Sequence, residues 1–67
     1  MTSRKLATVL KELREKSNLT QEQLAKRAEV ARSYLAKLEA GHSNNPSIGA
    51  LKRIAKALGV PVTELLE

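Results

Sequence analysis

The stretch from Leu19 to Gly41 constrains the fold most, because it encodes two short helices with too few residues between them for anything but a tight turn. Thr20 is a good N-cap, and Gln23 can return a hydrogen bond to the backbone amide of the cap, which makes a capping box. Leu19 before the cap and Leu24 after it can pack together as a hydrophobic staple. The sequence thus predicts a helix that begins directly after Thr20.

Apolar residues recur through this stretch at helical spacing. The first helix is expected to turn three of them inward: Leu24, Ala25 and Ala28. The second helix is expected to begin near Ala31 or Arg32 and to bury Leu35 and Leu38. Its outward face then carries Arg32, Ser33, Ala36 and Lys37. That face is small, basic and able to form hydrogen bonds.

These residues resemble the helix-turn-helix of the phage repressor and Cro-like (Xre) family of DNA-binding proteins. The resemblance extends from about Leu6 to Leu66 and rests, at the family's spacings, on Gln21, Ala25, Val30, Leu35 and Glu39. It implies an all-α, five-helix, lambda-repressor-like domain with its helix-turn-helix at about residues 20–40. It further implies that small Ala25 lets the two helices approach, with Val30 and Leu35 buried beneath the turn.

The subfamily is less specific. The run Arg32-Ser33-Tyr34 is similar to that of controller proteins of restriction-modification systems, which are small, dimeric and little more than this domain. Phage repressors, Cro proteins and antitoxin regulators share the same core. A chain that starts at Met and carries no tag fits a complete small protein, and a domain cut from a longer one would look the same.

Two residues at the turn depart from the family pattern. The family usually has Gly at the position of Glu29, because that residue takes a positive φ, and a non-Gly residue there costs roughly 1 kcal/mol. The family favours Ser or Thr at the position of Ala31, the N-cap of the second helix. An alanine cap forfeits about 0.5 to 2 kcal/mol.

The remaining helices follow from caps and apolar stripes. A helix is expected to start after Thr2 or Ser3 and to end near Ser17, because Asn18 accepts the left-handed conformation of a helix end. Its stripe is Leu6, Val9, Leu10 and Leu13. A fourth helix, capped by Ser47 and closed by Gly59, has the stripe Ile48, Leu51, Ile54, Ala55 and Leu58. A short fifth helix follows Pro61 and ends in Leu65 and Leu66.

Arg14 is either a solvated charge or half of an ion pair. Family members commonly carry Arg at this place, paired with the Glu that ends the second helix of the motif, which here is Glu39. The resemblance therefore implies an Arg14–Glu39 pair that locks the N-terminal helix of the chain to the second helix of the motif, the recognition helix.

Several side chains of the recognition helix are placed to read bases. Such a helix enters the major groove with its N-terminal part toward base edges. Arg32 can grip guanine O6 and N7 with two hydrogen bonds, and Lys37, one and a half turns on, can reach the same base type. Ser33 can donate or accept, so it specifies less. Ala36 either touches a thymine methyl or acts as a spacer.

Phosphate contacts are expected around this helix. Gln21, at the N-terminus of the preceding helix, should bind phosphate through its backbone amide with the helix dipole assisting. Tyr34 packs partly in the core, places its hydroxyl on phosphate, or does both. In the loop after Gly41, the short donors Ser43 and Asn44 are candidates for phosphate, and His42 is either a contact or simply exposed.

Charge and composition suit this function and argue against others. The net charge of +5 and the pI near 10.0 favour a polyanionic partner, and the acidic end with Glu64 and Glu67 should face away from DNA. Seven scattered glutamates and one loop histidine offer no acid-base constellation, so no catalytic residue, cofactor or small-molecule substrate is expected. One His, no Cys and no Asp argue against a metal site.

Residues 1–67 are expected to form a single domain in the cytoplasm. No apolar run approaches the roughly 18 residues of a membrane span, and the N-terminus lacks the apolar segment of a secretory signal. The expected function is a sequence-specific transcriptional regulator that reads double-stranded DNA with the helix at 31–40. The alternative is an antitoxin-like or coactivator-like protein-interaction module on the same fold, against which the basic recognition face argues.

A homodimer on a palindromic operator is expected, because one recognition helix reads only a few base pairs. At this size folding buries only about 60% of the unfolded chain's surface, so association can add stability. The expected interface lies beyond the fourth helix, at Val60, Val62, Leu65 and Leu66, since one helix face cannot readily bury all four. Two-fold pairing would place half-sites about 34 Å, or 10 base pairs, apart.

Overall fold

The computed structural model describes residues 4–42 and 46–66. Within these ranges the chain forms helices and no strand, so the all-α prediction is confirmed. The helices are α1 (Arg4–Lys16), α2 (Gln21–Ala28), α3 (Arg32–Glu39), α4 (Ile48–Leu58) and α5 (Thr63–Leu66). The predicted caps Thr2 and Ser3 of the first helix lie outside the described residues.

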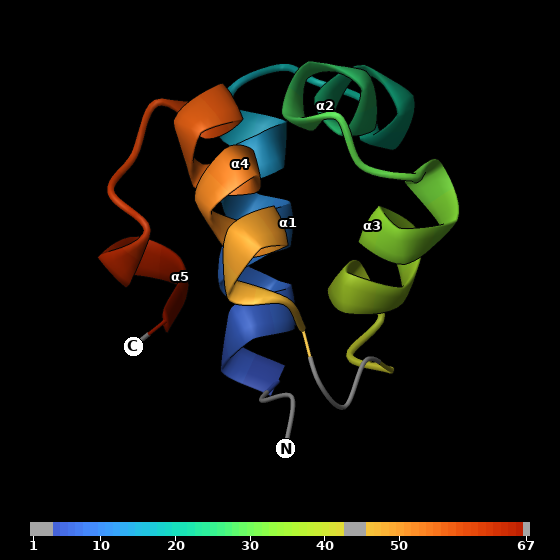
Figure 1. The fold of residues 1–67 in the computed structure, drawn as a ribbon. Helices are drawn as coiled ribbons and strands as arrows, with labels where there is room; N and C mark the ends of the chain where they lie inside the picture. Colours follow the sequence, from blue (N-terminus) through green and yellow to red (C-terminus); the bar gives the residue numbers. More distant parts are fainter. Residues whose placement is uncertain (1–3, 43–45, 67) are drawn as a thin grey trace.

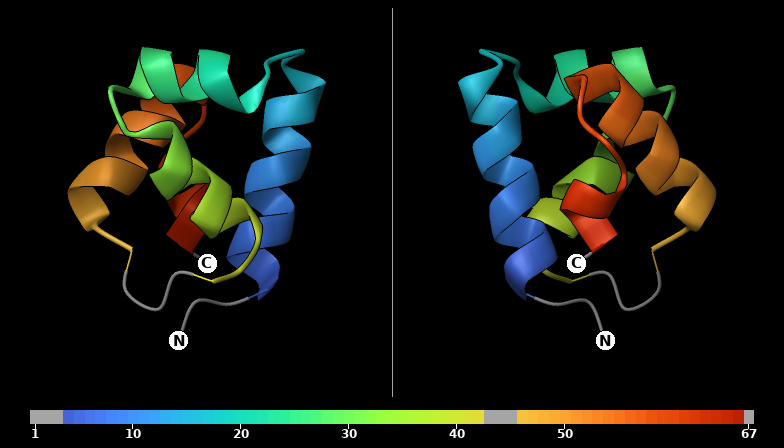
Figure 2. Two further views of the ribbon diagram at one scale, coloured as in Figure 1. Left: turned by 90° about the vertical axis from the view of Figure 1, so that its right-hand side faces the viewer. Right: turned by 90° about the vertical axis from the view of Figure 1, so that its left-hand side faces the viewer.

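The helices enclose a single core. In Figure 1, α2 lies across one end of the upright α1, with α3 on one side, α4 in front and the short α5 on the other side. Figure 2 shows α3 crossing one face and α5 lying between α1 and α4 on the opposite face. α2 packs on α3 and α4, while α1 packs on α3 and α5. The second helix of the motif is therefore supported from both α1 and α2.

The core is aliphatic, and every helix contributes to it. Its fully buried side chains are Leu10, Leu24, Leu35, Leu38 and Ile54. Ala25 and Ala28 are also buried, as predicted for the inward face of α2. Each fully buried Leu or Ile contributes about 1.5 to 3 kcal/mol. Since α3 supplies two of the five, much of what holds it in place is hydrophobic.

Two predictions about burial were wrong. Ile48 was expected in the buried stripe of α4 but is 52% exposed, whereas Ala50, which was not expected there, is buried. The stripe runs through Ala50, Leu51, Ile54 and Ala55, so Ile48 lies to one side of it. Val30 was expected to be buried beneath the turn, and it is only half-buried at the edge of the core.

The helices α1 to α4 all end in the same way. A left-handed residue follows the last turn, and the next amide donates to a carbonyl five residues back, at 3.0 to 3.2 Å. The left-handed residues are Asn18, Glu29, Gly41 and Gly59, with φ of 58, 59, 75 and 74°. Three of them, Asn18, Glu29 and Gly59, were predicted as helix ends or positive-φ positions. Only Glu29 belongs to a residue type that rarely adopts this conformation.

Candidate nucleic-acid interface

The outward face of α3 is exposed because its other face is anchored in the core. Leu35 and Leu38 are fully buried. On the opposite side Arg32, Ser33 and Lys37 are exposed, as the sequence predicted, while Ala36 is half-buried. Two cations and one hydroxyl thus stand on one face of a helix of eight residues, which is a surface of the kind that reads base edges.

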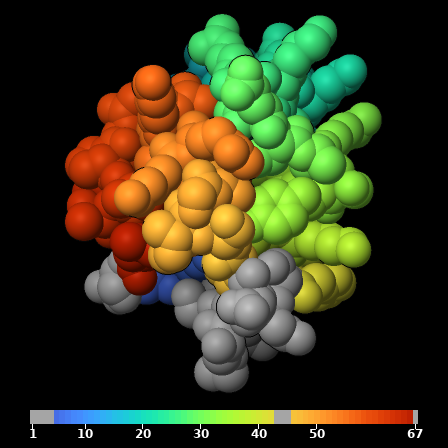
Figure 3. Space-filling model, viewed as in Figure 1, coloured from blue at the N-terminus to red at the C-terminus, as the bar shows by residue number. Residues whose placement is uncertain are grey.

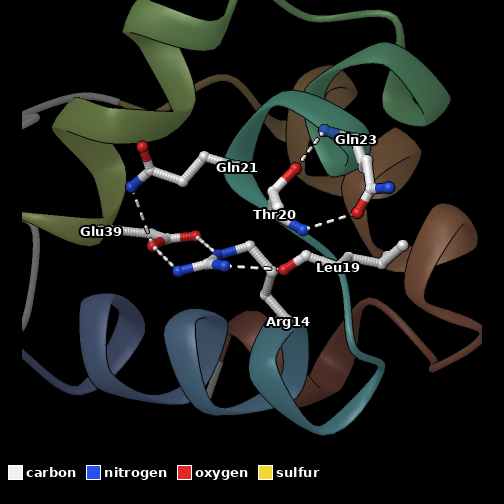
Figure 4. A network of polar contacts seen from close by, with 6 residues as sticks. All are labelled: Arg14, Leu19, Thr20, Gln21, Gln23 and Glu39. Atoms are coloured by element: carbon white, nitrogen blue, oxygen red, sulfur yellow. Dashed lines mark hydrogen bonds and ion pairs between the residues drawn. The ribbon is translucent and has the colours of Figure 1, made fainter.

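The predicted pair between Arg14 and Glu39 is present and joins α1 to the end of α3. The guanidinium donates from Nε to Oε2 of Glu39 at 2.7 Å and from Nη2 to Oε1 at 3.0 Å. Its Nη1 donates to the carbonyl oxygen of Leu19 at 2.7 Å, just before α2 (Figure 4). The side chains are only 12% and 3% exposed. The hydrogen bond with Glu39 is the main cause that raises the pKa of Arg14 above its usual value, so this cation stays charged.

Gln21 joins this network through its side chain, a contact that the sequence reasoning missed. Its Nε2 donates to Oε1 of Glu39 at 3.1 Å, so the carboxylate accepts three hydrogen bonds (Figure 4). The signal available was that a carboxylate buried with one Arg has lone pairs left over, which need further donors. α1, the start of α2 and the end of α3 are therefore tied at one point.

Tyr34 fastens the other side of α3. Its ring is half-buried against the core, and its hydroxyl accepts a hydrogen bond from the backbone amide of Ser47 at 3.0 Å. Ser47 in turn caps α4, since its Oγ accepts from the amide of Ala50 at 3.3 Å. Partial core packing, one of the two roles considered for Tyr34, is thus observed. The bond to Ser47 was not predicted; the amide of an N-cap residue has no partner inside its own helix, and it needs an acceptor.

The predicted phosphate contacts at Ser43 and Asn44 lie outside the described residues and stay predictions. His42 is exposed, and its backbone amide donates to the carbonyl of Lys37 at 3.0 Å, which closes the end of α3.

The predicted dimer patch requires a correction. Leu65 is 3% exposed and belongs to the core of the monomer, because α5 packs on α1 and α4 through this side chain. Val60 and Val62 are half-buried at the edge of the same core. Leu66, on the outer side of the single turn of α5, is 44% exposed. The candidate patch is therefore Val60, Val62 and Leu66.

Within residues 4–42 and 46–66, no helix has the length and apolar character to cross a bilayer. The same ranges hold no group of three or more His, Cys, Asp or Glu side chains that could share a metal ion.

The geometry agrees with a known family. Residues 10–65 match the family model described as helix-turn-helix. The chain belongs to the helix-turn-helix family. The predicted resemblance to phage repressors and controller proteins is confirmed, because both kinds of protein are among its relatives.

Among these relatives is the immunity repressor protein of Bacillus phage phi105, 42% identical over 57 residues, which cover 85% of this chain and 39% of the repressor. Control protein C.BamHI of Bacillus amyloliquefaciens is 40% identical over 52 residues, covering 78% of this chain and 63% of that protein. The chain thus spans less than two thirds of the length of each of these relatives.

A solved structure extends the likeness to nearly the whole chain. The N-terminal DNA-binding domain of SinR from Bacillus subtilis has a TM-score of 0.91 and 32% identity, covering 97% of this chain and 94% of that one. SinR in complex with DNA gives a TM-score of 0.88 and 34% identity, covering 92% and 98% of the two chains. The five-helix DNA-binding fold predicted from the sequence is confirmed.

Proposed function

We propose that this DNA-binding regulator of transcription reads its operator with α3 in the major groove, as a homodimer on a palindromic site. The observation that carries the proposal is the exposed face of Arg32, Ser33 and Lys37 on a helix fixed from both sides. A side chain discriminates bases only if its helix is held in one orientation, and the contacts to Arg14 and Ser47 supply that restraint. The regulator names of the relatives support the same function and name no enzyme activity.

Bases and phosphates are assigned to different parts of the surface. Arg32 and Lys37 are assigned to guanine edges. Ser33 is assigned to a base edge that either donates or accepts a hydrogen bond. Ala36 is assigned to a thymine methyl or to a spacer role. The start of α2 is assigned to phosphate. Its capping box uses the amides of Thr20 and Gln23, which leaves those of Gln21 and its neighbour Glu22 at the positive end of the helix dipole.

Three further assignments remain part of the proposal. Ser43 and Asn44 are assigned to phosphate, and the hydroxyl proton of Tyr34 can be donated outward because its oxygen already accepts from Ser47. The protein has to reach DNA, so the proposal includes the predicted cytoplasmic location. No cofactor or small-molecule substrate is invoked.

Selection of bound sites from a pool of random duplexes tests the function as a whole. We expect enrichment of an inverted repeat whose half-sites lie about 10 base pairs apart, because two-fold related helices enter successive major grooves. A single unrepeated half-site would contradict the dimer, and recovery of no sequence preference would contradict base readout. The second outcome would favour the interaction-module alternative.

The dimer has its own test at Leu66. We expect Leu66→Glu to give a folded monomer, because this exposed leucine lies outside the core while a charge would prevent pairing of the apolar patch. Operator affinity should fall by tenfold or more, since one half-site is then read alone. On the same samples, sedimentation measures the association state, circular dichroism the folding, and titration with operator duplex the affinity, with the exposed Ile48→Glu as control. A wild type that stays monomeric and binds one molecule per site would refute the dimer.

A further inference from the structure

An open groove runs between α4 on one side and the end of α2 with the following turn on the other. It consists of two adjoining hollows of about 420 and 380 Å³, which share Glu29 and Arg53. Figure 3 shows the face on which α4 lies beside the end of α2. The exposed reading residues of α3 line neither hollow. The groove thus lies beside the base-reading side chains and does not include them, while Ala31 and Tyr34 line one of its hollows.

The two ends of the groove differ in character. The first hollow is basic, with three cations and one carboxylate; its lining is Arg27, Ala28, Glu29, Arg53, Lys56 and Ala57. Within the described residues, none of these four charges has an opposite charge within 4.0 Å. No internal ion pair therefore neutralises these charges, and they are available to a ligand.

The second hollow is mainly apolar. Besides the shared Glu29 and Arg53 it is lined by Val30, Ala31, Tyr34, Ser47 and Ala50. Val30 and Tyr34 are only half-buried, so part of their hydrocarbon surface faces the hollow. Burying such surface under an aliphatic side chain stabilises a complex by about 25 cal/mol per Å².

We propose that this groove binds an acidic, amphipathic segment of a partner protein, with carboxylates on Arg27, Arg53 and Lys56 and an aliphatic side chain in the apolar hollow. The positive charge of the first hollow attracts the carboxylates of such a segment, and the second hollow can bury one of its apolar side chains. A DNA backbone fits less well, because phosphates gain nothing from the apolar end.

The test uses the full chain and a fluorescein-labelled peptide, Glu-Glu-Leu-Leu-Asp-Glu-Leu-Leu-Glu, whose leucines fall on one helix face. Fluorescence anisotropy should give a dissociation constant of roughly 10 to 100 µM, as for a small transient interface. Arg53→Glu should weaken binding about tenfold or more, because it places a like charge opposite the peptide. Arg27→Glu and Lys56→Glu should act in the same direction, and they serve as independent variants should one of them fail to fold by circular dichroism.

Lys52→Glu is the matched control, since Lys52 is an exposed cation on the same helix that lines neither hollow. It should leave peptide binding within twofold of the wild type. Glu29→Gln should strengthen binding roughly two- to fivefold by removing repulsion. Peptides with Gln for each acidic residue, or with Ser for each leucine, should both bind at least tenfold more weakly, because the groove is expected to use charge and apolar surface together.

Several outcomes would overturn the proposal. Absence of binding at 1 mM peptide, or an equal loss in Lys52→Glu and Arg53→Glu, would reduce the groove to general basic surface. Displacement of the peptide by a duplex, together with an equal loss of duplex binding in Arg53→Glu, would assign the groove to the DNA backbone. Because the peptide is titrated without DNA, failure here leaves the proposed reading by α3 untouched, and failure of that reading leaves this result untouched.

Discussion

The two helices of the motif begin in opposite ways. α2 begins at a complete capping box, in which the Gln23 amide donates to Oγ1 of Thr20 at 3.1 Å and the Thr20 amide donates to Oε1 of Gln23 at 2.9 Å. α3 begins at Ala31, which has no side-chain cap, and the chain reaches it from the left-handed Glu29. The helix assigned to phosphate is locally well specified, and the helix proposed to read bases is locally poorly specified.

The difference teaches where the stability of α3 comes from. With an alanine cap and a strained turn before it, local interactions disfavour its start by about 1 to 3 kcal/mol. Its fixed position depends instead on long-range contacts, namely the buried leucines, the Arg14–Glu39 pair and the bond from Ser47 to Tyr34. Removing a long-range contact should therefore affect α3 more than repairing a local one.

The largest effect is expected at the ion pair. Arg14→Ala and Glu39→Ala should each lower the free energy of unfolding by roughly 3 kcal/mol, because each leaves a nearly buried charge without its partner. The double variant should lose clearly less than the two single losses combined, with a coupling of about 0.5 to 3 kcal/mol. Urea unfolding of the four proteins measures this. A coupling near zero would mean that the pair does not hold α3 in place.

A smaller effect, of opposite sign, is expected at Glu29. Glu29→Gly should raise the free energy of unfolding by roughly 0.5 to 1 kcal/mol, since glycine adopts a φ of 59° without strain. Gly59→Ala is the reverse control: it has a φ of 74° and an added Cβ there meets no atom within 4 Å, so it measures backbone strain alone. Thermal melts should shift in opposite directions. No gain from Glu29→Gly would show that the turn is not strained.

The smallest effect is expected at the start of α3. Ala31→Ser should stabilise by roughly 0.5 kcal/mol, because the new hydroxyl can accept from an amide of the first turn, and the backbone at Ala31 already has cap geometry (φ −69°, ψ 141°). Thr20→Ala removes the cap of α2 and should destabilise the domain by about 1 kcal/mol. It is the reference for how much a side-chain cap contributes to the stability of this protein. If Ala31→Ser gave no gain while Thr20→Ala cost this much, the start of α3 would not be limited by its missing cap.

Features of the fold that depend on neighbours in sequence were predictable. The capping box, the left-handed helix ends and the inward face of α2 each follow from a few adjacent residues. The Arg14–Glu39 pair spans 25 positions and was expected only through the resemblance to the family. The helix boundaries thus follow from caps and periodicity, and the pairing of α1 with α3 follows from the family pattern.

What could not be predicted depends on tertiary placement. The inward direction of α4 is set by its contact with α2, which buries Ala50 and leaves Ile48 outside. Adjacent Leu65 and Leu66 cannot be told apart until the packing of α5 is known. The bonds of Gln21 to Glu39 and of Ser47 to Tyr34 join residues whose proximity no local pattern encodes.

The central claim is that α3 reads bases through Arg32, and competition between a selected operator and random duplex tests it most directly. Arg32→Ala should lower operator affinity by about 1 to 3 kcal/mol, leave affinity for random duplex nearly unchanged, and relax the preference at particular base pairs. An equal loss on operator and random duplex in Arg32→Ala would make Arg32 a phosphate contact and contradict the account.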